Sequence, residues 1–177
     1  MNTTIPPRFS AALLATLAML FGTLVHADSH SDKAMASGAP TVLITGANRG
    51  LGLEFARQYA ADGWQVIGTA RKPGQADELN ALAVEVVQLD VVDQASVDAL
   101  AKSLEGRPID LLINNAGIFP RVTKIEEINF DDYSRTMAVN TLGPVRVTRA
   151  LLPNLRSGDG KTIVNITSRL GSIGLND

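Results

Sequence analysis

The sequence predicts an α/β fold, a doubly wound parallel sheet of the Rossmann type. From Thr41 onward, short apolar runs rich in β-branched residues alternate with segments of helical periodicity. The apolar runs are continuous, which is typical of strands buried on both faces of a parallel sheet. Glycines separate the first run from the first helical segment. The chain has 177 residues, enough for one such domain.

Composition excludes several function classes. Lys and Arg total 16 against 18 for Asp and Glu, and no window clusters the basic residues, so we expect no nucleic-acid partner. The absence of cysteine excludes disulfides, a thiolate metal site and a cysteine nucleophile. The two histidines, His26 and His30, lie outside the predicted domain, so we expect no metal site.

The first 27 residues have the layout of a secretory signal peptide. Arg8 precedes the apolar run Ser10–Val25, and small residues suit cleavage after Ala27. The prediction is an exported protein, periplasmic or secreted. An uncleaved membrane anchor is the alternative, because 16 residues lie just below the ~17 to 25 of a spanning helix. If the segment is not a working signal, the protein is cytoplasmic.

Residues 28–40 are small and polar without periodicity, and they predict a linker before a domain at 41–177. The domain opens with a buried strand, Thr41–Ile44, and a helix that Gly63 ends. The turn between them lets the backbone approach a pyrophosphate closely, while free N–H groups at the helix start favour the anion. An ordinary glycine-rich turn is the alternative. The predicted cofactor-binding residues here are Thr45, Gly46, Asn48, Arg49, Gly50, Leu51 and Gly52.

The turn has the spacing Gly-x-x-x-Gly-x-Gly after Thr45, and it lacks the Gly-Lys-Ser/Thr end of a nucleoside-triphosphate loop. This pattern resembles that of the short-chain dehydrogenase/reductase family. The resemblance implies an oxidoreductase that exchanges a hydride between NAD(P) and a small-molecule carbonyl or alcohol substrate. It also implies that the full-length form is a homo-oligomer.

The second strand, predicted at Trp64–Thr69, is followed by two cations, Arg71 and Lys72. An acidic residue at this position would hold the ribose hydroxyls of NAD, whereas cations suit the 2′-phosphate of NADP(H). Arg49 in the glycine turn adds a third cation. The sequence therefore favours NADP(H) over NAD(H), and a solvated basic loop is the alternative.

The third strand, predicted at Val84–Leu89, ends at Asp90 and Val91. Carboxyl ends of strands bind ligands in doubly wound sheets. Asp90 resembles the family position whose carboxylate accepts a hydrogen bond from the adenine amino group, and capping of the next helix by Asp90 is the alternative. We expect Asp93 to cap that helix, predicted at Gln94–Leu104.

A fourth strand, Ile109–Ile113, leads into the most specific feature of the chain. In the resembled family the backbone of this turn lies along the cofactor, and an asparagine amide ties neighbouring strands together. Taken alone, an Asn-Asn turn would indicate only a left-handed connection. The residues that we assign to cofactor binding are Asn114, Asn115, Ala116 and Gly117.

Two residues match catalytic positions of the family, which uses Ser, Tyr, Lys and a helical Asn. Asn140 lies in a predicted long helix, Phe130–Leu155, just before a kink at Gly143-Pro144. Ser168 follows a fifth strand, predicted at Lys161–Ile166, by one intervening residue. A surface asparagine and a turn serine are the alternatives.

No Tyr-x-x-x-Lys occurs in the 177 residues, and neither Tyr59 nor Tyr133 follows the fifth strand. We therefore expect a C-terminally truncated Rossmann domain, part of an NADP(H)-dependent carbonyl reductase or alcohol dehydrogenase. A non-catalytic NADP(H)-binding module is the alternative. With strand order 3-2-1-4-5, the fifth strand is at the edge, and its apolar side chains are expected to be partly exposed.

Overall fold

The computed structural model describes residues 38–119 and 124–168. The predicted signal segment 1–27 and linker residues 28–37 lie outside the described residues, as does everything after Ser168. Five parallel strands form one sheet in the order β3-β2-β1-β4-β5, which confirms the predicted doubly wound topology. The strands are β1 (Thr41–Ile44), β2 (Gln65–Ala70), β3 (Glu85–Gln88), β4 (Leu111–Asn114) and β5 (Thr162–Asn165).

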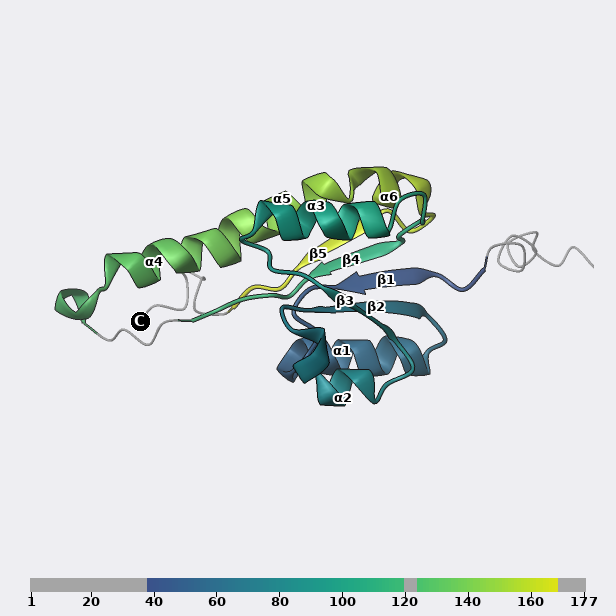
Figure 1. Cartoon of the computed structure of the whole chain (residues 1–177), viewed down its shortest axis with the longest axis horizontal. Helices are drawn as coiled ribbons and strands as arrows, with labels where there is room; N and C mark the ends of the chain where they lie inside the picture. Colours follow the sequence, from purple (N-terminus) through teal and green to yellow (C-terminus); the bar gives the residue numbers. More distant parts are fainter. Residues whose placement is uncertain (1–37, 120–123, 169–177) are drawn as a thin grey trace, which may run out of the picture. The chain divides into compact units, whose positions relative to one another are not determined.

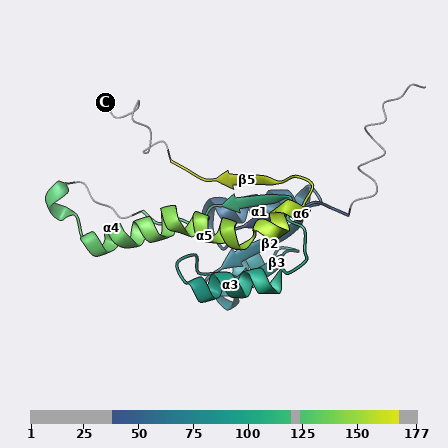
Figure 2. The same ribbon diagram turned by 90° about the horizontal axis from the view of Figure 1, so that it is seen from above.

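Helices cover both faces of this sheet (Figure 1). On one face lie α1 (Gly50–Ala61) and α2 (Asp77–Asn80), and on the other lie α3 (Gln94–Ser103), α5 (Gly143–Ala150) and α6 (Leu152–Ser157). Helix α4 (Phe130–Met137) continues the line of α5 beyond the end of the sheet (Figure 2). Short 3₁₀ turns occur at Pro73–Gln75 and Ile125–Glu127. None of the helices in residues 38–119 and 124–168 is long and apolar enough to cross a membrane.

The domain has two hydrophobic cores, one on each face of the sheet, and alternate residues of the strands contribute to each. In β1, Leu43 belongs to the core under α3 and α5, whereas Val42 and Ile44 belong to the core under α1 and α2. Because successive side chains of a strand point to opposite faces, a continuous apolar strand supplies both cores at once. All four residues of β1 are buried, as predicted for a central strand.

At the edge of the sheet, β5 pairs with β4 and with no other strand of the described residues. Ile163 is 42% exposed and Val164 is 37% exposed, which confirms that the apolar side chains of this strand are partly exposed. An edge strand with open apolar side chains is a surface that further chain or another molecule can cover.

The predicted long helical segment, Phe130–Leu155, is helical over nearly its whole length but is divided into three α-helices. A π-helical turn, Ala138–Leu142, separates α4 from α5, and a second break at Leu151 separates α5 from α6. Pro144 has no N–H to donate to the carbonyl of Asn140, so regular α-helical bonding cannot pass this point. The irregularity predicted at Gly143-Pro144 thus begins earlier and includes Asn140.

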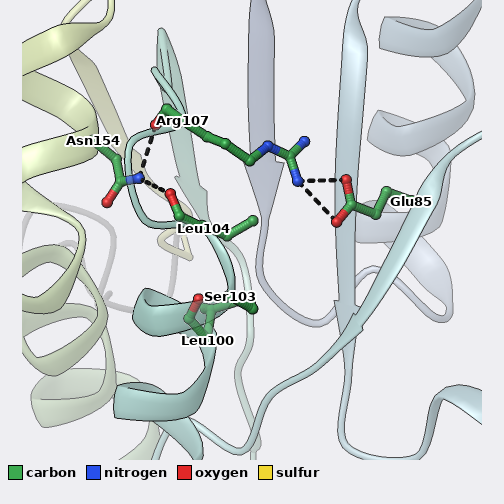
Figure 3. A network of polar contacts seen from close by, with 6 residues as sticks. All are labelled: Glu85, Leu100, Ser103, Leu104, Arg107 and Asn154. Carbon is green, nitrogen blue, oxygen red and sulfur yellow. Dashed lines mark hydrogen bonds and ion pairs between the residues drawn. The ribbon is translucent and has the colours of Figure 1, made fainter.

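A polar network that the sequence patterns did not reveal ties α6 to the body of the domain (Figure 3). Asn154 is buried, and its Nδ2 donates hydrogen bonds to the carbonyls of Leu104 (2.6 Å) and Arg107 (2.8 Å). The Arg107 guanidinium pairs in turn with Glu85 of β3, 2.8 Å from its Oε2. Buried polar groups are stable only when bonded, so this amide fixes α6 against the loop after α3.

Candidate functional site

A cavity of about 400 Å³ lies at the carboxyl ends of the strands. This edge is where open α/β sheets bind ligands. Most of the predicted site residues line it: Gly46, Asn48, Arg49, Gly50, Leu51, Arg71, Asp90, Val91, Asn115, Ala116 and Gly117. Five others do not: Thr45, Gly52, Asn114, Asn140 and Ser168. The cavity is further lined by residues that the sequence reasoning missed: Leu89, Val92, Ile118, Arg135 and Val139.

Thr45 acts behind the cavity wall. Its buried hydroxyl oxygen accepts hydrogen bonds from the backbone N–H groups of Asn115 and Ala116, each at 2.9 Å. The Asn115 amide donates back to the carbonyls of Thr45 (3.0 Å) and Gly46 (3.1 Å). Four hydrogen bonds therefore lock the glycine turn to the turn after β4, and the two turns form one rigid wall.

Two glycines are required by the close packing of this wall. Gly46 has φ +66°, and a Cβ there would lie 3.0 Å from Ala116 Cα. A Cβ on buried Gly52 would overlap the carbonyl oxygen of Gly46 and lie 2.5 Å from Asn115 Nδ2. Real Cβ contacts are not as short as those at Gly52, so a side chain there must displace its neighbours. At Gly46 the contact is tight, and the left-handed backbone also disfavours any other residue.

Gly52→Ala is expected to weaken the site although alanine is the better helix former. The new methyl group displaces the Asn115 amide, so we expect stability to fall by about 1–3 kcal/mol and dinucleotide affinity to fall with it. Urea unfolding and ligand titration measure the two effects. Gly74→Ala is the matched control, because a Cβ there meets no atom within 4 Å. Equal results for the two variants would contradict this prediction.

The start of α1 faces the cavity through Gly50 and Leu51. The residue before the helix, Arg49, makes no side-chain capping hydrogen bond, and the first turn carries no acidic residue. A helix start of this kind presents free N–H groups and the positive end of the helix dipole, which together attract an anion.

A second, open hollow of about 650 Å³ shares Asn48, Arg49, Arg71 and Asp90 with the cavity. It adds Lys72, so three cations border the space beyond the end of β2. Arg71 and Lys72 are exposed, and neither forms an ion pair within residues 38–119 and 124–168. Three cations around one space suit a ligand group with more than one negative charge.

Asp90 does not cap α3, so that alternative is wrong. Its Oδ1 accepts a hydrogen bond from the N–H of Val92 at 3.2 Å, within the loop. The cap is Asp93, as predicted, whose Oδ1 accepts from the N–H of Ala95 at 3.0 Å. The Asp90 carboxylate thus retains acceptor capacity at the cavity wall.

Asn114 and Asn140, two of the predicted site residues that do not line the cavity, make hydrogen bonds that hold the fold together. Asn114 is buried, and its Nδ2 donates to Asn165 Oδ1 (3.0 Å) and Thr148 Oγ1 (3.3 Å), which ties β4 to β5 and α5. The Asn140 side chain accepts from the N–H of Ile118 (2.9 Å) and donates to its carbonyl (2.8 Å). Asn140 therefore fixes the strand-to-loop segment after β4 against the π-helical turn.

Ser168 lies three residues past the end of β5 and is exposed. The end of β5 lies beside the end of β4, and the turn after β4 lines the cavity. In the part of the chain that the structure describes, no group of three or more His, Asp or Glu side chains is arranged to hold a metal ion.

Comparisons with known proteins agree with this geometry. Residues 40–176 match the family model for short chain dehydrogenase. Retinol dehydrogenase 5 from Mus musculus is 37% identical over 142 residues, covering 76% of this chain and 44% of that protein. The chain thus spans about half the length of such relatives.

Two solved structures extend the comparison to three dimensions. The NADPH-bound carbonyl reductase from chicken fatty liver superposes with a TM-score of 0.70 at 36% identity, over 78% of this chain and 63% of that one. A short-chain dehydrogenase/reductase from Burkholderia multivorans with bound NADP gives a TM-score of 0.70 at 34% identity, with the same coverage of 78% and 63%. The family-model match spans more than half of the chain, and the chain belongs to the short-chain dehydrogenase/reductase family.

Proposed function

We propose that this protein is the cofactor-binding part of an NADP(H)-dependent oxidoreductase that reduces carbonyls or oxidises alcohols. The observation that carries the proposal is the cavity itself: an anion-binding helix start adjoins a space bordered by Arg49, Arg71 and Lys72. The NADPH and NADP named for the chicken and Burkholderia structures support the same cofactor.

The residues present fit a dinucleotide. The glycine turn can lie close to a pyrophosphate because Gly46 and Gly50, which line the cavity, carry no side chains, and α1 offers free N–H groups. The turn at Asn115–Gly117 supplies a second stretch of backbone along the same wall. The walls at Leu89, Val91 and Val139 are apolar, and Asp90 adds an acceptor. This part of the cavity would hold the adenine, and Asp90 would accept a hydrogen bond from its amino group.

Cofactor choice rests on the cations after β2. A 2′-phosphate on the adenosine ribose carries up to two negative charges and accepts charge-assisted hydrogen bonds from guanidinium groups. Arg71 follows directly on β2, the place where this fold discriminates the ribose substituents. No carboxylate follows β2 to hold the ribose hydroxyls of NAD(H), since the next residues are Arg71 and Lys72.

The bound nicotinamide supplies the hydride, and the chain's residues must orient the substrate oxygen and supply its proton. We assign Ser168 to donate a hydrogen bond to that oxygen, since a hydroxyl beyond the carboxyl end of a strand can reach a substrate at this edge. Asn140 positions the turn after β4 through its two bonds to Ile118. Small-molecule carbonyls and alcohols are therefore the substrate class of the proposal.

The experiment that tests the cofactor proposal compares Arg71→Asp with the wild-type chain. Loss of the guanidinium and gain of a carboxylate are expected to lower the ratio of NADPH to NADH affinity by at least about tenfold, because one or more charge-assisted hydrogen bonds are lost. Fluorescence titration with both reduced dinucleotides measures the ratio.

Arg156→Asp is the control for this substitution. It makes the same change in net charge at an exposed residue of α6 that does not line either hollow. We expect it to leave the affinity ratio unchanged. An unchanged ratio in Arg71→Asp itself would overturn the assignment of NADP(H).

A further inference from the structure

Arg135 is a cation on the cavity wall with no assigned role. It lies in the last turn of α4 and is exposed, and it lines the cavity together with Val139. Its side chain forms no ion pair or hydrogen bond with other residues in 38–119 or 124–168. An exposed arginine that borders a cavity and has no partner in the described chain is available to a ligand.

The helical stretch that begins with α4 and carries Arg135 contacts the segment that follows β3. Val139 packs against the core that contains Leu89 and Val91 at the end of that strand. Farther along the same helical stretch, a Cβ on Gly143 would lie only 2.9 Å from Val91 Cγ2. Arg135 precedes Val139 by four residues, and both residues line the cavity. Arg135 therefore belongs to the same stretch of cavity wall as Val139.

In the proposed function, on which this inference rests, the diphosphate lies at the glycine turn and the adenine lies at the end of β3. The cavity there is lined by the apolar side chains of Leu89, Val91 and Val139 and by Asp90. Such a lining suits an apolar ring with a hydrogen-bonding edge. The guanidinium is also planar and stacks on aromatic faces.

We infer that Arg135 holds the adenine ring of the bound dinucleotide by packing its guanidinium against the ring. This contact raises the affinity for the cofactor without affecting the choice between NADP(H) and NAD(H), because both carry the same adenine. Arg71 has the opposite signature, since it contacts the group by which the two dinucleotides differ. The two arginines are thus separable in one set of titrations.

The test measures the binding of four ligands to the 177-residue chain: NADPH, NADH, adenosine 2′-monophosphate and reduced nicotinamide mononucleotide. Arg135→Ala is expected to weaken the first three by one common factor of about 5- to 30-fold, the range for a desolvated cation–π contact. Reduced nicotinamide mononucleotide, which has no adenine, is expected to bind unchanged. Arg135→Lys, which keeps the charge and loses the plane, is expected to lie between wild type and alanine.

Arg149→Ala is the matched control. It removes the same charge from an exposed position in α5 that does not line the cavity, and it is expected to leave all four affinities unchanged. Because Arg135 is exposed, its variants should melt at the wild-type temperature, and a melting curve recorded for each variant checks this.

Three outcomes would overturn the inference. Unchanged binding of adenosine 2′-monophosphate by Arg135→Ala, beside weakened NADPH and NADH, would place the guanidinium on the diphosphate. A changed ratio of NADPH to NADH affinity would place it on the 2′-phosphate. Equal losses of affinity in Arg135→Ala and Arg149→Ala would show that the effect comes only from the change in net charge. If wild type binds neither dinucleotide, the proposed function fails first, and this inference fails with it.

Discussion

The 177-residue chain, produced alone, is expected to oxidise no NADPH above the background rate when it is given aldehydes or quinones. Reduction of a carbonyl needs a positioned proton donor, and such a group typically contributes ~10² to 10⁴-fold to the rate. The family to which the chain belongs is expected to use a tyrosine assisted by a lysine, and no Tyr-x-x-x-Lys occurs in these residues.

Neither tyrosine of the chain replaces that donor. Tyr59 packs edge-on against Trp64, with ring centroids 5.0 Å apart, on the far side of the sheet from α5. Tyr133 is exposed on α4 and does not line the cavity. Without a donor at the substrate oxygen, hydride transfer would leave an unprotonated alkoxide, so turnover is not expected even when the cofactor binds.

The measurement follows absorbance of NADPH over a panel of aldehydes and quinones, with cofactor binding determined on the same preparation. Binding without turnover is the expected pair of results. Ser168→Ala and Thr167→Ala form a matched pair of hydroxyl deletions after β5. Turnover above background that Ser168→Ala abolishes and Thr167→Ala preserves would contradict the prediction.

The central strands β1 and β4 could be read from the sequence because all their residues are buried. A continuous apolar run such as Thr41–Ile44 is distinctive, and it supplies both cores from alternate residues. The glycine spacing and the Asn-Asn-Ala-Gly turn then fix which strand ends carry the site. These features are local, so they survive in the sequence as contiguous patterns.

The far wall of the cavity could not be read in the same way. Arg135 and Val139 reach it only because the π-helical turn and the packing of Gly143 on Val91 set the direction of α4 and α5. Helical periodicity assigns residues to a face of a helix, but it does not say what that face meets. Ile118 likewise enters the site through two hydrogen bonds to Asn140, 22 residues away.

Sequence motifs also do not separate residues that touch a ligand from residues that build the wall. Thr45 belongs to the glycine motif, yet its hydroxyl bonds the backbone of Asn115 and Ala116 behind the cavity. Asn114 belongs to the second motif, and its amide ties β4 to β5. The shape of the cavity wall needs both the residues that line it and the residues that support it, so both kinds occur within the same motif.

Asp110→Asn is expected to destabilise the domain by about 2–3 kcal/mol, because a carboxylate that accepts three backbone hydrogen bonds is replaced by a group with a single acceptor oxygen. Asp110 Oδ2 accepts from the N–H of Thr41 at 2.8 Å. Its Oδ1 accepts from the N–H groups of Asp159 (2.7 Å) and Gly160 (3.0 Å). One side chain thus joins the start of β1 to the loop that leads into β5, and the amide in its place turns a donor toward backbone donors.

This carboxylate also predicts how stability depends on pH. Burial raises the pKa of Asp110, but the three backbone N–H donors outweigh it, and the net pKa lies below the usual value. A group whose pKa is lower in the folded state stabilises the fold above its unfolded pKa of about 3.9, and loses that contribution as the pH falls through the folded value. The gap in unfolding free energy between wild type and Asp110→Asn should therefore be full at pH 7 and should shrink below about pH 4.

Urea unfolding at a series of pH values measures this gap, with Asp62→Asn as the control. Asp62 is exposed after α1, and its carboxylate makes no hydrogen bond to the described residues, so its variant should follow wild type at every pH. If Asp110→Asn also followed wild type at pH 7, the three hydrogen bonds would carry no net stability. If its gap stayed constant from pH 7 into acid, the loss would come from the amide's fit and not from the charge. Because the loop at Asp159 and Gly160 delivers the chain into β5, and Ser168 follows β5, the same variant should loosen the segment that carries the assigned hydroxyl.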